Sequence, residues 1–114
     1  MDMKKIPNEF YVGGQKMDIR MVDRCEDNKL GRCCVAGGWI EIADIFNKGE
    51  KCCESGKVNT FYHELTHSIL DTMGEYELSN NEKFVSSFSS FLTEAMRDAY
   101  FITDNDGLHQ TEEE

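Results

Sequence analysis

Apolar and polar side chains alternate along the first part of the chain in short segments that predict β-strands. Residues 17–22 alternate in this way, with the period of a half-buried strand. Gly13-Gly14 and Gly37-Gly38 separate neighbouring segments and predict hairpin turns. Three shorter apolar or β-branched runs also predict strands, at residues 10–12, 32–35 and 39–42. We therefore expect a small antiparallel β-sheet of three or four strands.

The second half of the chain changes its period. The polar residues 47–57 predict a loop, after which apolar side chains recur at steps of three and four residues. Gly74 is placed to end the resulting helix as a C-terminal cap. The apolar face of this first helix consists of Val58, Phe61, Leu65, Ile69 and Met73. A second helix is expected over about residues 81–100. Its predicted apolar face consists of Phe84, Val85, Phe88, Phe91, Leu92, Ala95 and Met96.

The order of these elements, strands first and helices last, predicts an α+β fold in which two packed helices cover one face of the sheet. A length of 114 residues is that of one domain. We assign a single domain to residues 1–103. Residues 104–114 form an acidic segment with little apolar surface to bury, and we expect them to be a frayed, disordered tail.

The chain is strongly acidic, with 22 Asp and Glu residues against 12 Lys and Arg residues and a net charge of −10. Nucleic acids and anionic membranes attract cationic proteins, so we expect neither as a partner. No apolar run approaches the roughly 20 residues that a membrane-spanning helix needs. Residues 1–5 are charged without an apolar run behind them, so a signal peptide is not expected.

The cysteines bear on the compartment and on a second metal site. Their number is odd, which favours free thiols in a reducing cytoplasm. They are Cys25, Cys33, Cys34, Cys52 and Cys53. The two adjacent pairs lack the spacing of zinc knuckles, so a second zinc site or a disulfide between the pairs is the less favoured alternative. Neighbours on a strand point to opposite faces, so one of Cys33 and Cys34 is expected in the core.

The first predicted helix carries the motif His-Glu-Leu-Thr-His at residues 63–67. Residues four apart share one face of a helix, so His63 and His67 can bind one zinc ion. Glu64 projects at a neighbouring angle, from which it can activate a zinc-bound water as general base without ligating the metal. The alternative is a pair of structural histidines at this spacing by chance, in a chain with only three. We expect one Zn²⁺ per chain.

A catalytic zinc needs a third protein ligand, and Glu82 at the start of the second helix is the candidate. Asp71 lies about 12 Å beyond His63 along the helix axis, too far to share the ion with both histidines. Glu82 has a competing interpretation, because Ser79 and Glu82 fit the S-x-x-E capping box. The ligand role is favoured because the ion needs an anion, but the sequence leaves both roles open.

Residues 61–70 resemble the active helix of ImmA/IrrE-type zinc metallopeptidases, gluzincin-like minimal domains common in phages and mobile elements. That family follows its HExxH helix with E-x-x-A-N-x-F-A-x-x-L. The matching positions in this chain are Glu82, Val85, Phe88 and Leu92. The resemblance implies a minimal zincin fold, peptidase activity and Glu82 as the third zinc ligand. The family's asparagine, which supports a zinc-bound histidine, is Ser86 here.

Two further residues are weaker candidates. Residues 39–42 are interpreted as a sheet edge that could hold an extended substrate, with Trp39 as a contact, although a buried core tryptophan fits equally well. Tyr76 is a candidate for stabilising the oxyanion. We expect a cytoplasmic zinc metallopeptidase that acts on a protein or peptide substrate. The rival function is a catalytically silent, zinc-stabilised binding module that recognises or inhibits a host protein.

Overall fold

A computed structural model describes residues 6–47 and 49–99. The predicted acidic tail and the last residues of the predicted domain lie outside the described residues. Strands precede helices, so the predicted α+β class is confirmed. The strands are β1 (Glu9–Val12), β2 (Gln15–Val22), β3 (Gly31–Cys34), β4 (Trp39–Ala43), β5 (Ile45–Phe46) and β6 (Glu50–Lys51). The helices are α1 (Glu54–Met73), α2 (Tyr76–Ser79) and α3 (Glu82–Arg97).

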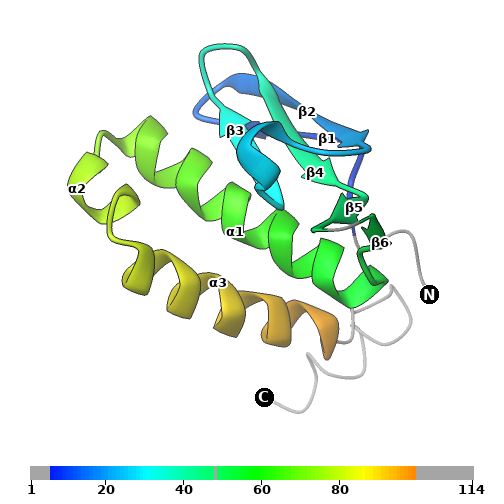
Figure 1. Cartoon of the computed structure of the whole chain (residues 1–114). Helices are drawn as coiled ribbons and strands as arrows, with labels where there is room; N and C mark the ends of the chain where they lie inside the picture. The colour runs from blue at the N-terminus through cyan, green and yellow to red at the C-terminus, as the bar shows by residue number, and fades with distance from the viewer. Residues whose placement is uncertain (1–5, 48, 100–114) are drawn as a thin grey trace, which may run out of the picture.

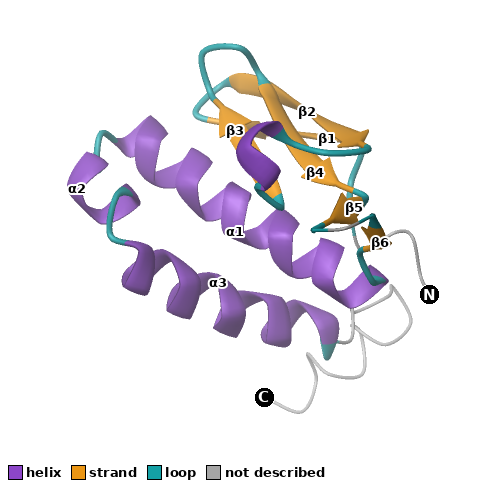
Figure 2. Ribbon diagram, viewed as in Figure 1, coloured by secondary structure: helices purple, strands orange, loops and turns teal. Residues whose placement is uncertain are grey.

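The four main strands form one mixed sheet in the order β1-β2-β4-β3 (Figure 2). The two predicted hairpins, β1–β2 and β3–β4, are antiparallel, but β2 and β4 run parallel. The prediction of a wholly antiparallel sheet is therefore wrong for the central pair. After β2 the chain passes a 3₁₀ turn, Glu26–Asn28, and forms β3 on the outer side of β4. Strand β4 then returns in the direction of β2.

This topology also corrects the predicted sheet edge. Strand β4, which contains Trp39, is bonded to a strand on each side, so residues 39–42 are internal. The two edges of the sheet are β1 and β3. Strand β3 is the edge that lies next to α1 (Figure 1).

Helix α1 is the middle layer, with the sheet on one side and α3 on the other (Figure 1). Phe61 joins the buried core of the sheet, where the ring of Phe10 meets it edge-on at 6.0 Å between centroids. The buried residues of this core are Met17, Ile40, Ile42 and Phe61. The sheet and α1 therefore share one apolar interior.

Helix α1 begins and ends for local reasons. It starts at Glu54, so the predicted loop over residues 47–57 is too long. The β5–β6 hairpin ends at Lys51, and α1 begins three residues later. It ends where predicted, at Gly74, which adopts a left-handed conformation with φ of 80°. The N–H of Gly74 donates to the carbonyl oxygens of Asp71 and Leu70, which would otherwise lack partners.

Helix α3 packs on α1 through a face that includes Val85, as predicted, but whose other buried residues are polar. Its buried residues are Val85, Ser89 and Thr93, one turn apart. Phe88 and Phe91, assigned to the buried face, are 48% and 72% exposed, so that assignment is wrong. Small side chains allow the two helices to approach. The hydroxyls of Ser89 and Thr93 are compatible with burial because they donate to backbone carbonyls of α3.

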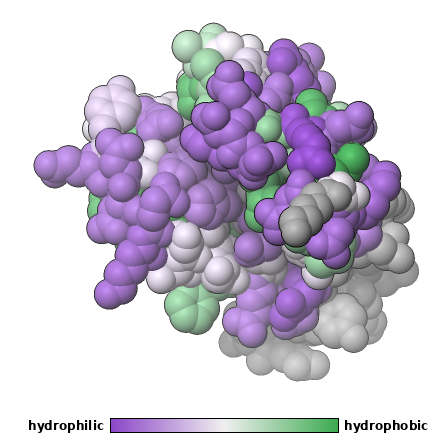
Figure 3. Space-filling model, viewed as in Figure 1, coloured by the Kyte–Doolittle hydropathy of each residue, from purple (hydrophilic) through white to green (hydrophobic). Residues whose placement is uncertain are grey.

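The exterior agrees with the acidic, polar composition. The face drawn in Figure 3 is mainly hydrophilic, with apolar residues scattered among polar ones. In the part of the chain that the structure describes, no helix has the length and apolar character needed to cross a bilayer.

Candidate metal centre

The histidines of the HExxH motif lie one turn apart in the middle of α1. Their rings meet edge-on, with 5.0 Å between centroids. The side chains of His63 and His67 are 24% and 16% exposed, so both are largely but not completely buried. The helix is regular through the motif although Thr66 lies within the motif and Ser68 follows it directly. The hydroxyls of Thr66 and Ser68 donate to carbonyl oxygens one turn earlier and so remain satisfied.

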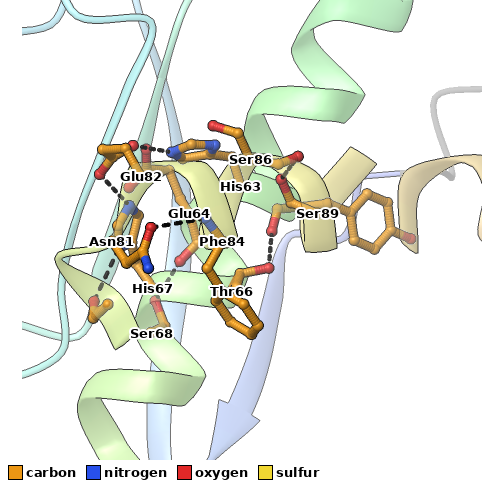
Figure 4. A network of polar contacts seen from close by, with 12 residues as sticks. His63, Glu64, Thr66, His67, Ser68, Asn81, Glu82, Phe84, Ser86 and Ser89 are labelled. Carbon is orange, nitrogen blue, oxygen red and sulfur yellow. Dashed lines mark hydrogen bonds and ion pairs between the residues drawn. The ribbon is translucent and has the colours of Figure 1, made fainter. Parts of the chain in front are cut away.

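Glu82 reaches both histidines from the start of α3 (Figure 4). One carboxylate oxygen, Oε1, lies 3.4 Å from Nε2 of His63, and the other, Oε2, lies 3.4 Å from Nε2 of His67. The short helix α2 turns the chain through the connector, which brings the first residue of α3 beside α1. The turn formed by α2 therefore places Glu82 next to the two histidines of the HExxH motif.

The competing role of Glu82 as part of a capping box is wrong. The N-cap of α3 is Asn81, whose side-chain oxygen accepts a hydrogen bond of 3.0 Å from the backbone N–H of Phe84. Ser79 lies in α2 and does not cap α3. Because Asn81 already satisfies the helix end, the carboxylate of Glu82 is available to the histidines.

The three side chains lie close enough together that they could hold a metal ion. Ligand atoms about 2.1 Å from a tetrahedral centre lie roughly 3.4 Å from each other. Each histidine Nε2 lies 3.4 Å from a different carboxylate oxygen of Glu82. One ligand atom from each of His63, His67 and Glu82 lies within 4.8 Å of the others. Two imidazoles and one carboxylate form a donor set that zinc accepts, and three protein ligands leave a fourth position open.

Glu64 lies beside this group but is not part of it. It is buried, with 7% of its surface exposed. Burial raises the pKa of Glu64 above its usual value, while the nearby imidazoles of His67 and His63 act in the opposite direction. A carboxylate with a raised pKa is a better match for proton transfer near neutral pH than an exposed one.

His67 has a partner that sequence reasoning missed. Its Nδ1 lies 3.0 Å from the hydroxyl oxygen of Ser79, which is 5% exposed. Such a contact fixes the ring orientation and leaves Nε2 as the atom that faces Glu82. The S-x-x-E pattern drew attention to Ser79, but as a helix cap. Sequence spacing alone does not predict a contact between Ser79 and His67, because the contact depends on the formation of α2.

The weaker candidates differ in position. Within the described ranges, no hydrogen bond joins the Ser86 side chain to either histidine, and Ser86 is exposed. Tyr76 is 63% exposed on α2 and does not line the cavity at the histidines. Trp39 does line this cavity, although it comes from an internal strand. Its ring is flanked by the guanidinium groups of Arg20 at 5.4 Å and Arg32 at 5.1 Å.

The histidines and Glu64 open into a cavity of about 650 Å³ between α1, the edge of the sheet and α2. Two cations lie on the sheet side of its lining. Arg32 is bound to Glu41 and Glu26, at 3.1 Å and 2.9 Å. Lys29 is exposed. The lining is mostly polar and consists of Lys29, Arg32, Cys33, Trp39, His63, Glu64, His67, Asp71, Ser79, Asn80 and Glu82.

All five cysteines are free thiols, so the alternative of a disulfide between the two pairs is wrong. Cys33 packs against the core, as expected for one member of its pair. In the described part of the chain, the structure groups no cysteine with His63, His67 and Glu82.

Comparisons of this chain with protein-family models, curated proteins and solved structures give no match. Function is therefore inferred from the side chains around the cavity and from the resemblance carried by the HExxH motif.

Proposed function

We propose that this protein is a zinc-dependent metallopeptidase that hydrolyses a peptide bond in a protein or peptide substrate. The observation that carries the proposal is the convergence of His63, His67 and Glu82 from two helices, with the carboxylate of Glu64 buried beside them. The resemblance to ImmA/IrrE-type metallopeptidases supports the same assignment. A site that only held a structural ion would have no use for Glu64.

A zinc ion bound by these ligands would polarise the scissile carbonyl and lower the pKa of water. Glu64 takes a proton from the attacking water as the water oxygen bonds to the carbonyl carbon. When the carbon–nitrogen bond breaks, Glu64 returns this proton to the leaving amine. Ser79 holds the ring of His67 throughout. Glu64 therefore acts first as the general base and then as the general acid.

The edge strand β3 is suited to hold the substrate. It pairs with β4 on one side only, and it lies against α1, which carries Glu64. An extended peptide can add to such an edge through backbone hydrogen bonds. This assignment replaces the predicted edge at residues 39–42. Arg32, in β3, and Lys29, just before it, line the cavity at the same edge.

The proposal includes a reducing cytoplasm as the site of action. Its support is the odd number of cysteines and the free state of all five thiols.

The first test is metal content. Protein purified without a histidine tag is expected to bind about one zinc per chain, measured by elemental analysis. Replacing both His63 and His67 with alanine should abolish this binding. The matched control is His109→Ala, which changes the remaining histidine of the sequence. Full zinc content in the double variant would move the metal elsewhere and overturn the assignment.

The second test separates hydrolysis from binding. The zinc-loaded protein is incubated with a peptide library from a digested lysate, and new N-termini are identified by mass spectrometry. Glu64→Gln should retain zinc and lower the cleavage rate by about 10²–10⁴-fold, the usual contribution of a general base. Glu94→Gln, an exposed position on α3, is the control. Equal cleavage by Glu64→Gln, or no cleavage by the wild type, would favour the binding module.

A further inference from the structure

The edge strand β3 lies close to α1 at Gly31. A β-carbon at this position would lie 2.5 Å from Cγ2 of Thr60. It would also lie 3.0 Å from Cγ and 3.2 Å from Oε2 of Glu64. Distances below about 3 Å between carbons are far inside van der Waals contact. A side chain at residue 31 would therefore clash with Thr60 and would also press on the Glu64 side chain.

The backbone conformation at residue 31 does not require a glycine. Gly31 is not among the residues with positive φ, so other residues could adopt its conformation. A glycine inside a strand weakens the strand, and it often marks a close approach of backbone or ligand. A glycine is needed here because Thr60 and Glu64 occupy the space that a side chain would fill.

Cys33 lies on the same face of β3, two residues further along. It lines the cavity, and its thiol lies beside the Glu64 carboxylate. Burial raises the pKa of Cys33 to about 12, so the thiol stays protonated and can only donate toward the carboxylate. Glu64 is thus enclosed by β3 on one side and by the histidine face of α1 on the other.

We infer that Gly31 is a positioning residue for Glu64: the bare backbone of β3 at Gly31 sets where the Glu64 carboxylate can lie relative to His63 and His67. This inference rests on the proposed peptidase function, in which Glu64 is the base. A displaced base loses its alignment with the reacting atoms while the zinc ligands stay in place. Misplacement by about 1 Å can lower a rate by about 10²-fold.

Gly31→Ala alone would clash with Thr60 as well as with Glu64, and it can fail by unfolding. Thr60→Ser removes the clashing methyl group and retains the hydroxyl that donates to the carbonyl oxygen of Gly56 at 3.0 Å. The decisive variant is therefore Gly31→Ala combined with Thr60→Ser. Thr60→Ser alone is the background control. Gly56→Ala is the control for adding a methyl group, because its β-carbon would meet only Cys53 Sγ, at 3.3 Å.

Two measurements are made on the double variant. The first is kcat, KM and zinc affinity. The Glu64 side chain must move by only a few tenths of an ångström, so we expect kcat to fall about 3- to 10-fold, with KM and zinc affinity unchanged. The second uses metal-free protein labelled with ¹³C at the glutamate carboxyl carbons. The Glu64 and Glu82 signals are assigned from Glu64→Gln and Glu82→Gln. We expect the Glu64 signal to move and the Glu82 signal to stay.

The outcomes separate this inference from the proposed function. An unchanged Glu64 signal with unchanged kcat would overturn the role of Gly31. A parallel loss of zinc affinity would also overturn it, because the damage would then extend to the metal ligands. A shifted Glu64 signal in a protein whose zinc-loaded wild type hydrolyses nothing would support the placement of Glu64 by Gly31 and overturn the peptidase function.

Discussion

The hydroxyl of Ser79 lies 3.0 Å from Nδ1 of His67, and this contact joins α2 to the face of α1 that carries both histidines. Ser79→Ala removes the contact without changing a ligand. We expect zinc affinity to fall about 10–100-fold, the usual effect of losing a partner of a ligating histidine. Competition with a chromogenic chelator measures this. Ser89→Ala is the control, because Ser89 is equally buried but donates to the backbone of α3. Equal losses in both variants would contradict a specific role for Ser79.

Glu82→Gln tests the third ligand. The amide keeps the shape of the side chain but loses the charge, so we expect zinc affinity to fall by at least 10–100-fold. Stability of the metal-free protein should change little, since the exposed Glu82 does not cap α3. Asn81→Ala should show the reverse pattern, with unfolding about 1 kcal/mol easier and zinc affinity less affected. Zinc titration and urea denaturation of both variants check the pair. Unchanged affinity in Glu82→Gln would remove Glu82 from the site.

The five thiols should differ widely in reactivity. The pKa of Cys53 is lowered, first by the Ser55 side chain and then by the backbone N–H of Gly56, whereas burial raises the pKa of Cys33 to about 12. Only the thiolate reacts, so iodoacetamide should label Cys53 first and Cys33 last. As pH rises from 6 to 9, labelling of Cys53 should accelerate at lower pH than labelling of any buried cysteine. Peptide mapping by mass spectrometry gives the order, and early labelling of Cys33 would contradict its burial.

The packing face of α3 can be tested by two substitutions. Val85→Ala removes buried methyl groups and should lower the free energy of unfolding by roughly 2 kcal/mol. Phe91→Gln changes a side chain that is 72% exposed, and it should change stability by less than about 0.5 kcal/mol. Urea denaturation of both variants measures these values. A larger loss for Phe91→Gln would restore the face predicted from the apolar pattern.

Local features of this chain could be predicted from sequence. The HExxH spacing places His63 and His67 on one helix face whatever surrounds the helix, and Gly74 ends α1 by its own conformational freedom. Glu82 required one further step, the need of zinc for a third ligand, and the contact with both histidines agrees with it.

Features that depend on tertiary packing could not be predicted. The parallel pairing of β2 and β4 depends on which side of β4 the strand β3 occupies. The buried face of α3 depends on how closely α1 approaches, which favours Ser89 and Thr93 over larger apolar residues. The contact between Ser79 and His67 exists only because α2 forms between two longer helices. Hydrophobic periodicity describes one helix or strand at a time, so it does not predict how these elements pack against each other.

The composition of the buried face of α3, one apolar and two polar residues, bears on how quickly a metal ion would leave the candidate site. Two of the three candidate ligands belong to α1, but Glu82 belongs to α3, whose buried face contains the small residues Ser89 and Thr93. Segments with few buried apolar contacts open locally before the whole protein unfolds. Each opening of α3 would carry Glu82 away and leave two histidines, which hold zinc less firmly. The dissociation rate would then follow the opening frequency of α3 rather than the strength of the metal–ligand bonds.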